Sequence, residues 1–297
     1  MLKNMKYIEP IIKACIDIAK NINAPIICLS DLPIKTDDVP VIIAENSTLK
    51  INKMMPVAES DSKGGQIIQI LKNIEFHSKT SSEQISDAAV LSYINGLLKG
   101  DYVVGIVEMQ DTVSIVVHDL TENKIINELL DCGERVDMRL LLSVMNVAFD
   151  IAAFGREGVP VGCAFVIGDV DEVMRRSHQL VLNPYYGHKS EERDVLDPCT
   201  WEALKEFVQL DGVIVIDDKG LVVAAGRYLD VDAREILIKQ GLGARHAAIA
   251  AITRDTQAVG IAVSQTGGVI RIFKDGITVV EINPTTKIIN RYGLDKT

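Results

Sequence analysis

Short apolar runs alternate with segments of helical spacing along most of the 297-residue chain, and this alternation limits the folds that the chain can form. For the N-terminal part it predicts a small parallel or mixed sheet covered by helices, which we describe as a three-layer α/β domain. The expected elements, in chain order, are a helix, two strands, a second helix and a pair of strands at Ile8–Ile22, Ala24–Leu29, Val39–Glu45, Ser81–Leu98, Tyr102–Met109 and Thr112–His118.

The same alternation continues in the C-terminal part, where glycines, prolines and capping residues mark the ends of the elements. Asp169 and Thr200 stand where side chains commonly cap the start of a helix, and we expect them to do so. The expected elements are a long helix, a strand, a second helix and the two strands of a hairpin at Arg135–Phe154, Pro160–Ile167, Trp201–Gln209, Gly212–Ile216 and Leu221–Ala225.

The apolar pattern breaks between Leu120 and Glu134, and no linker rich in proline or glycine marks the junction. A chain of 297 residues is long enough for two domains with their own cores. We therefore expect an N-terminal domain at residues 1–125, a C-terminal domain at residues 126–288 and a short tail at residues 289–297.

The charge and hydropathy of the chain exclude several classes of function. A net charge of -10 and a pI of about 5.1 argue against binding to nucleic acid polymers or to anionic membranes, because both need a dense positive surface. No apolar run is long enough to span a membrane, and the N-terminus lacks the apolar core of a secretory signal. We expect a cytoplasmic protein.

Cysteine and histidine spacing predicts neither a disulfide framework nor a zinc site. The five cysteines lack a C-x-x-C pair, which favours reduced and buried thiols, and the five histidines lack an i, i+4 partner that could share a metal. Asp61–Gly65 contains the residue types of a phosphate-binding loop but not their order, so a surface loop is the favoured interpretation. Ligand sensing by the N-terminal domain is left open.

The clearest chemical signal is an acid at the start of a strand, followed later by a basic, glycine-rich helix start. Asp211 opens the strand, and Gly243, Ala244, Arg245 and His246 open a helix rich in alanine and isoleucine. Unpaired N–H groups and a partial positive charge at such a helix start suit a polyphosphate. Asp211 is suited to holding a divalent metal or polarising a hydroxyl. Together the pieces indicate nucleotidyl transfer, although an Asp-Gly pair alone is more typical of a turn.

Two more acids lie at the other end of the same strand. Asp217 and Asp218 begin a four-residue hairpin turn that ends at Gly220, so we interpret both as turn residues. Most of a strand length separates them from Asp211, which is too far for a shared metal ion. Asp211 is therefore the acid that we predict to be functional.

Several ordered motifs of the C-terminal part resemble those of the diadenylate cyclase family. The likeness covers roughly residues 130–285 and is specific, because the order and the spacing of the motifs agree. The motifs are Gly155–Gly158, Val161–Asp169, Asn183–Gly187, Leu210–Gly220, Val223–Leu229, Gly243–His246 and Ile261–Gln265. The helix and strand pattern of the N-terminal part resembles the C-terminal domain of pyruvate kinase, which accompanies archaeal-type members of the family.

The resemblance implies a mixed central sheet flanked by helices, and it implies roles for individual residues. Asp211, Arg245 and His246 would be catalytic, and Asp211 would also hold the Mn²⁺ or Mg²⁺ ion that the family uses. Leu229 would line the adenine pocket and Ser264 would contact phosphate, although core packing and a polar strand end explain these two residues equally well. The residues implied to bind ATP are Asp211, Gly212, Leu229, Gly243, Ala244, Arg245, His246 and Ser264.

The reaction implied by the resemblance makes cyclic di-AMP, a second messenger, from two ATP molecules. Each ribose 3′-hydroxyl attacks the α-phosphorus of the other ATP, and two pyrophosphates leave. With one ATP site in each catalytic domain, two copies of the chain must meet face to face. We therefore expect a homodimer or a larger homo-oligomer.

One position departs from the family pattern. Bacterial members usually carry a second arginine directly after the histidine, where this chain has Ala247. The candidates to replace that cation are Arg227, Arg254 and Arg271. Two other functions stay open: a catalytically inactive sensor that binds nucleotide, and an α/β interaction module that binds none.

Overall fold

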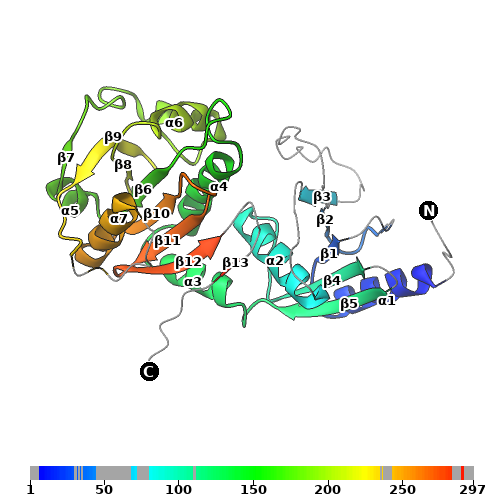
Figure 1. Cartoon of the computed structure of the whole chain (residues 1–297). Helices are drawn as coiled ribbons and strands as arrows, with labels where there is room; N and C mark the ends of the chain where they lie inside the picture. Colours follow the sequence, from blue (N-terminus) through cyan, green and yellow to red (C-terminus); the bar gives the residue numbers. More distant parts are fainter. Residues whose placement is uncertain are drawn as a thin grey trace. The chain divides into compact units, whose positions relative to one another are not determined.

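The structure is a computed structural model of the chain (Figure 1), and it describes residues 7–29, 32, 34, 36–44, 68–71, 80–109, 112–234, 236, 243–282 and 289–290. The chain divides into two compact units, Met1–Ile126 and Asn127–Thr297. The predicted loop at Asp61–Gly65 and the two residues between the predicted strands Tyr102–Met109 and Thr112–His118 lie outside the described residues.

The first unit contains a five-stranded sheet in the order β3-β2-β1-β4-β5. Strands β1 to β4 pair in parallel, and β5 runs antiparallel to β4. The strands are β1 Ile26–Leu29, β2 Val41–Ala44, β3 Ile68–Leu71, β4 Tyr102–Met109 and β5 Thr112–Asp119. Four of them match predicted strands, and β3 has no counterpart in the sequence prediction.

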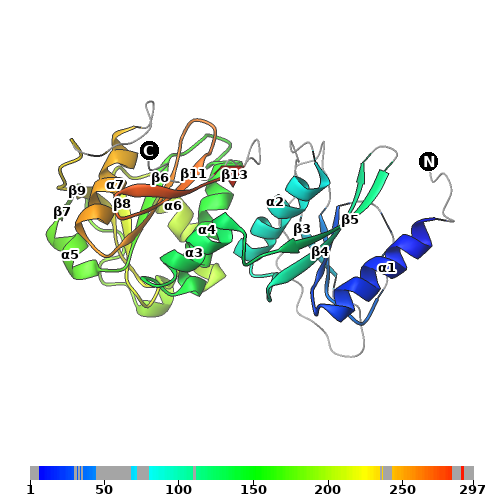
Figure 2. The ribbon, with the colours of Figure 1, turned by 90° about the horizontal axis from the view of Figure 1, so that it is seen from below.

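Helices α1 (Ile8–Asn21) and α2 (Ser81–Ile94) lie on opposite faces of this sheet (Figure 2). Apolar side chains of α1 pack into one cluster with Val104 and Ile106 of β4. Gly105 lies between these two residues and faces the other way, where a Cβ atom would overlap Ile85 of α2. A capping box of Thr80 and Glu83 starts α2.

The second unit contains an eight-stranded sheet in the order β13-β12-β11-β10-β6-β8-β9-β7. Only β6 and β8 pair in parallel, so the sheet is mixed, as expected. The strands are β6 Cys163–Ile167, β7 Ser177–Gln179, β8 Val213–Ile216, β9 Val222–Leu229, β10 Val259–Val263, β11 Ile270–Lys274, β12 Ile277–Ile282 and β13 Ile289–Asn290.

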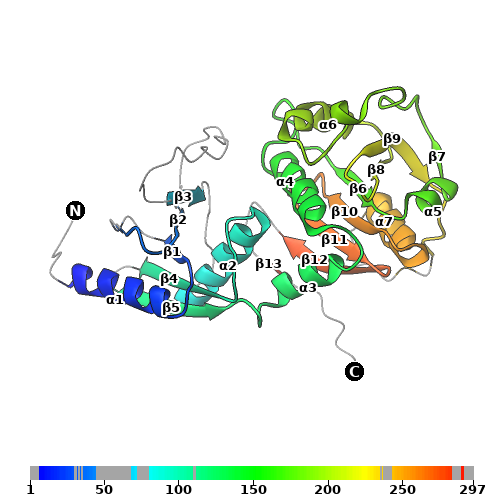
Figure 3. The same cartoon turned by 180° about the vertical axis from the view of Figure 1, so that it is seen from behind.

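Helices cover both faces of this sheet. Helix α7 (Ala244–Asp255) packs Ile249, Ala250 and Ile252 against β6, β8 and β10 in front of the sheet in Figure 1, and helix α4 (Met138–Phe154) comes to the front in Figure 3. A Cβ atom at Gly260 of β10 would overlap Ile249, so the absence of a side chain there lets α7 approach the sheet closely. The shorter helices are α5 Val170–Arg175 and α6 Trp201–Phe207, with 3₁₀ turns at Ser190–Glu192 and Pro198–Thr200.

Helix α3 (Lys124–Cys132) occupies the segment where the sequence analysis placed only a break. Asn123 caps its start, since its side-chain oxygen accepts from the N–H groups of Ile125 and Ile126 at 3.1 and 3.2 Å. Its last turn is tied to strand β11, because Lys274 donates to the carboxylate of Asp131 at 2.6 Å.

Asp169 and Thr200 occupy the N-cap positions of α5 and α6 as predicted, but neither side chain caps its helix, and tertiary contacts explain why. Asp169 has a left-handed backbone (φ 44°), and its carboxylate accepts from the N–H of Gln257 at 2.8 Å instead of capping α5. Thr200 donates its hydroxyl to the carbonyl of Asp194 at 2.7 Å. Asp197 is the cap there, because its carboxylate accepts from the N–H of Cys199 at the start of the 3₁₀ turn.

Within the described part of the chain, no helix combines the length and the apolar character that crossing a bilayer requires. The longest helix, α4, has 17 residues and carries Arg139 and Asp150. Four of the five cysteines are buried free thiols, as predicted, and Cys199 is exposed.

Candidate functional site

Asp211 lies directly before strand β8 and presents its carboxylate to solvent, with 94% of the side chain exposed. Gly212 follows with φ 101°, a backbone conformation that side chains rarely adopt. A Cβ atom at Gly212 would overlap the backbone of Arg227 on the neighbouring strand β9. Gly212 is therefore required for the close pairing of β8 and β9, and Asp211 places an acid before the strand.

Asp217 lies at the opposite end of β8 and is a turn residue, as predicted. Its carboxylate accepts from the N–H groups of Lys219 and Leu221 at 2.9 and 2.8 Å, and Gly220 has φ 91°. Both lone-pair positions facing the turn are thus used by the backbone. Asp217 cannot serve the site around Asp211.

Helix α7 begins beside Asp211. Gly243 is its N-cap residue, with φ -72° and ψ 170°, and both Gly243 and Ala244 are exposed. Among the described residues, no heavy atom lies within 4 Å of the position where a Cβ atom of Gly243 would stand. The partly positive start of the helix is therefore not covered by the described part of the chain, and an anionic group can approach its N–H groups there.

Arg245 joins the helix start to the strand start. Its Nη2 atom lies 3.7 Å from Oδ1 of Asp211, and its Nη1 atom donates to the carbonyl of Gly162. The Gly162 contact orients the guanidinium, of which 31% stays exposed. The structure thus brings two of the predicted catalytic residues together and leaves donor groups of Arg245 available to a ligand.

His246 points into the protein, with 7% of its surface exposed. Its Nε2 atom lies 3.1 Å from Oγ of Ser264 and 3.4 Å from Nη1 of Arg271. Burial, and then the positive charges of Arg271 and Arg245, lower the pKa of His246 to about 4. His246 is therefore a neutral imidazole near pH 7, and Ser264, which the family resemblance implied to contact phosphate, lies beside its ring.

Of the three arginines considered as replacements for the missing cation, only Arg271 lies beside His246. Arg227 donates to Ser177, and Arg254 pairs with Asp255 at 2.7 Å. Arg271 forms a buried ion pair with Glu281 at 2.7 Å. Sequence reasoning did not find Glu281. A signal was present, since each of these two charges interrupts an apolar strand.

Leu229 is 5% exposed and packs in the core cluster under α7, with Val213 and Ile249 among its members. That position supports the packing interpretation of Leu229 that the sequence left open. The neighbouring Tyr228 is 53% exposed, and its ring centroid lies 5.3 Å from that of His178. The ring of Tyr228 is therefore more accessible to a ligand than the side chain of Leu229.

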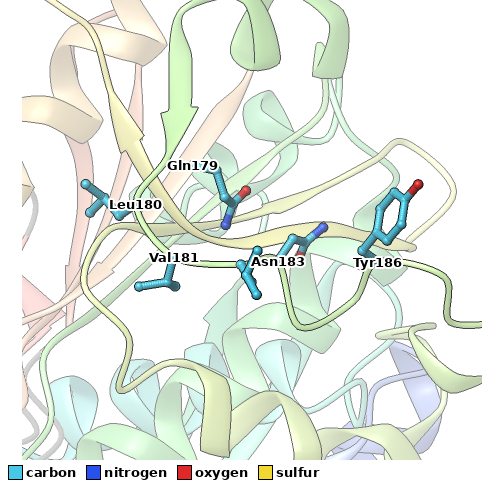
Figure 4. Close-up of a pocket in the computed structure, with 6 residues that line it drawn as sticks. Gln179, Leu180, Val181, Asn183 and Tyr186 are labelled. Carbon is cyan, nitrogen blue, oxygen red and sulfur yellow. The ribbon is translucent and has the colours of Figure 1, made fainter.

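A surface hollow of about 730 Å³ lies beside strand β9 and was not found from the sequence; its lining residues are Gln179, Leu180, Val181, Leu182, Asn183 and Tyr186 (Figure 4). The amides of Gln179 and Asn183 donate to backbone carbonyls of β9, so the hollow presents mainly apolar groups. A Cβ atom at Gly226 would lie 2.9 Å from Val181 and 3.7 Å from the carbonyl oxygen of Asp211. The hollow therefore adjoins the site at one edge.

A metal ion at this site would depend on few protein ligands. No group of three or more His, Cys, Asp or Glu side chains that could hold a metal exists among the residues with described positions. Among the described residues, Asp211 is the exposed carboxylate that lies beside Arg245 at the start of α7. Mg²⁺ commonly keeps several water ligands and binds through one or two carboxylates plus substrate phosphates, so this donor set fits a hard divalent cation that arrives with a nucleotide.

Comparison with known proteins gives matches in both units. Residues 150–278 match the family described as DisA bacterial checkpoint controller nucleotide-binding, and residues 10–121 match the family described as Probable sensor domain DacZ_A. The second match does not test the resemblance to pyruvate kinase, which stays a prediction.

Two relatives named diadenylate cyclase are similar to this chain. The protein from Methanocaldococcus jannaschii is 38% identical over 180 residues, which cover 60% of this chain and 57% of that protein. The protein from Haloferax volcanii is 42% identical over 155 residues, which cover 52% of this chain and 56% of that protein. The chain thus spans a little over half of the length of each relative.

A solved structure of DacA from Staphylococcus aureus shares 20% identity, with a TM-score of 0.34, over 47% of this chain and 83% of that one. The sequence matches are the stronger finding. The segment that matches the nucleotide-binding family, residues 150–278, contains Asp211, Arg245, His246 and Ser264.

Proposed function

We propose that this chain is a nucleotidyltransferase, a diadenylate cyclase that converts two ATP molecules into cyclic di-AMP and two pyrophosphates. One observation carries the proposal: Arg245, at the exposed start of α7, lies 3.7 Å from the exposed carboxylate of Asp211. An acid and a guanidinium at a helix start are the groups that nucleotidyl transfer needs. The match of residues 150–278 to a nucleotide-binding family supports the same assignment.

Each residue of the proposed site has a distinct task. The N–H groups at Gly243 and Ala244 and the guanidinium of Arg245 bind the triphosphate of ATP. His246 is neutral and provides a ring N–H for a phosphate oxygen, and Ser264 holds the ring from behind at 3.1 Å. Asp211 orients the 3′-hydroxyl that attacks the second ATP.

The divalent cation, Mn²⁺ or Mg²⁺, would be held by Asp211 together with phosphate oxygens of ATP. When bound, such an ion neutralises charge on the phosphate groups as the P–O bond to pyrophosphate breaks. An exposed carboxylate suits this role, because an ion that enters with its nucleotide needs an open approach.

The adenine base would lie against the apolar surface beside strand β9. Leu229 remains the residue implied by the family resemblance, and Gly212 keeps the strand start close enough for the base and the phosphates to reach one site. The burial of Leu229 means that only the edge of its side chain can contact a base. Tyr228, which is 53% exposed, would supply the larger contact.

The reaction requires two sites that face each other, so we propose a homodimer as the smallest active form. We further propose a three-layer α/β sensor domain at residues 1–125 and a catalytic domain at residues 126–288, with residues 289–297 as a tail. The match of residues 10–121 to a probable sensor domain supports a regulatory role for the first domain. The cytoplasmic location stays a prediction.

The direct test incubates the purified full chain with ATP and either Mn²⁺ or Mg²⁺ and separates the products by chromatography. Cyclic di-AMP and pyrophosphate should form in a ratio of one to two. The rate per chain should fall on dilution, because dimers dissociate. A chain that binds ATP but forms no cyclic product under any of these conditions would contradict the proposal.

A catalytically inactive nucleotide sensor is the second candidate, and Ala247 is the observation that favours it. Ala247 follows His246 on α7 and cannot contribute the cation that bacterial family members usually have at that position. A sensor would bind ATP or cyclic di-AMP without turnover. Calorimetry with both nucleotides, next to the product assay, separates the two functions.

A further inference from the structure

Four polar side chains form a continuous row behind the exposed part of the site. Glu281 of β12 accepts from Nε of Arg271 at 2.7 Å, and Nη1 of Arg271 donates to Oγ of Ser264 at 2.8 Å. Oγ of Ser264 lies 3.1 Å from Nε2 of His246. The row therefore connects strand β12 to the first turn of α7.

The row is built into the sheet by strand pairing. Arg271 and Glu281 are direct partners across β11 and β12, and they are 7% and 9% exposed. Ser264 follows β10, and its N–H donates to the carbonyl of Val269 at 2.8 Å, which closes the β10–β11 hairpin. Burying a guanidinium and a carboxylate is unfavourable unless each satisfies the other. A protein that keeps such a pair in an apolar sheet gains little stability from it, which points to another role.

The hydrogen-bond pattern fixes the proton on the imidazole. The Nη1 atom of Arg271 carries two protons and can only donate hydrogen bonds. It lies 3.4 Å from Nε2 of His246. Ser264 accepts from the same Nη1 atom, so its own proton is free to be donated to Nε2. Two donors facing Nε2 require a lone pair there. The single proton of the neutral ring must then be on Nδ1.

We infer that Arg271, with its charge neutralised by Glu281, is a positioning residue that holds His246 in the Nδ1–H tautomer. The Nδ1–H group is then a fixed hydrogen-bond donor of the site, and His246 does not transfer a proton. The inference rests on the proposed function only in its second part, the use of this donor in cyclic di-AMP synthesis. The tautomer itself is a property of the folded protein without nucleotide.

The first test is nuclear magnetic resonance of the full chain labelled with ¹⁵N, at a pH above 7. Multiple-bond ¹H–¹⁵N correlations distinguish a protonated ring nitrogen from an unprotonated one, and His246→Gln identifies the signals of this ring. We expect a protonated Nδ1 and an unprotonated Nε2. A protonated Nε2 in the native protein would overturn the inference without any reference to activity.

The second test removes the ion pair of Arg271 and Glu281 by replacing both residues at once. The double variant Arg271→Met, Glu281→Met leaves no uncompensated buried charge, so it is the variant expected to fold. We expect a mixture of the two tautomers, and a fall in kcat of about tenfold with a KM for ATP within about twofold of the native value. A double variant that keeps the pure Nδ1–H tautomer and the native kcat would overturn the inference.

Lys274→Met is the matched control. Lys274 also lies on β11, is 8% exposed and forms an ion pair with Asp131, but it contacts neither Ser264 nor His246 in the described part of the chain. Its variant should keep the native tautomer and the native kcat. If the native chain makes no cyclic di-AMP at all, the proposed function fails, and the resonance measurements still decide the role of Arg271.

Discussion

Arg245 and Asp211 face each other at 3.7 Å, with 31% and 94% of their side chains exposed. An ion pair this open contributes little to folding stability, because solvent screens both charges. The carboxylate therefore lacks a structural task within the described residues that would explain its position. Its role is therefore to bind a ligand. Variants of Asp211 should change activity and leave stability unchanged, unlike variants of buried charges.

Asp211→Asn should abolish cyclic di-AMP synthesis, with a loss of about 100-fold or more, because the amide neither holds a cation nor polarises a hydroxyl. The melting temperature should stay near that of the native chain, since the side chain is 94% exposed. Product chromatography and a thermal melt measure the two effects. Asp217→Asn is the control at the other end of β8 and should retain activity, since an amide oxygen can still accept from Lys219 and Leu221.

Arg245→Lys should raise the KM for ATP by about tenfold while the protein remains folded. A single ammonium group cannot contact the Gly162 carbonyl and a phosphate oxygen with the forked geometry of a guanidinium. Initial rates over a range of ATP concentrations give the result. Arg254→Lys, in the last turn of the same helix, should leave the KM unchanged; an equal rise for both variants would mean that the effect is not specific to the position of Arg245 beside Asp211.

Gly212→Ala should destabilise the second unit by about 2 kcal/mol or more, because the residue has φ 101° and the added methyl group overlaps the backbone of Arg227. Urea unfolding measures the change. Gly187→Ala is the matched control, since Gly187 has φ 83° but no heavy atom within 4 Å of the added Cβ position. Similar losses in the two variants would mean that backbone strain, and not the strand contact, makes a glycine necessary before β8.

The free energy of unfolding should depend on pH through His246, whose pKa falls from its usual 6.5 to about 4 in the folded chain. Between these two values the unfolded chain holds a proton that the native chain lacks, so stability rises as pH increases from about 4 and levels off above 6.5. The full effect is about 3 kcal/mol.

Urea unfolding at several pH values should reveal this dependence, and His246→Gln should flatten it within the same window. His178→Gln, which removes an exposed histidine, controls for the loss of an imidazole. A native chain and a His246→Gln variant with parallel pH profiles would mean that folding does not lower the pKa of His246.

Local signals predicted the parts of the structure that depend on neighbours in the sequence. The hairpin turn ending at Gly220 needed only the residues at that position. The closeness of Asp211 and Arg245 was predicted from a family likeness, because no local rule joins a strand start to a helix that begins so much later in the chain.

The predictions that failed depended on contacts between distant segments. Asp169 accepts from the backbone of Gln257, a partner that no local pattern reveals, and so it does not cap α5. Glu281 was missed because its role appears only when the register of β11 and β12 is known. Helix α3 was missed although its apolar residues have helical spacing, because the polar residues before it were interpreted as the end of regular structure.

Gly260 determines how closely α7 lies on the sheet, although it contacts no residue of the proposed site. A helix of 12 residues moves as a rigid rod, so a methyl group beneath its middle would displace both of its ends. The distance between the start of α7 and Asp211 thus depends on Gly260, a residue that takes no part in the chemistry. Variants designed to change nucleotide preference should therefore alter the exposed residues beside β9 and keep Gly260 unchanged.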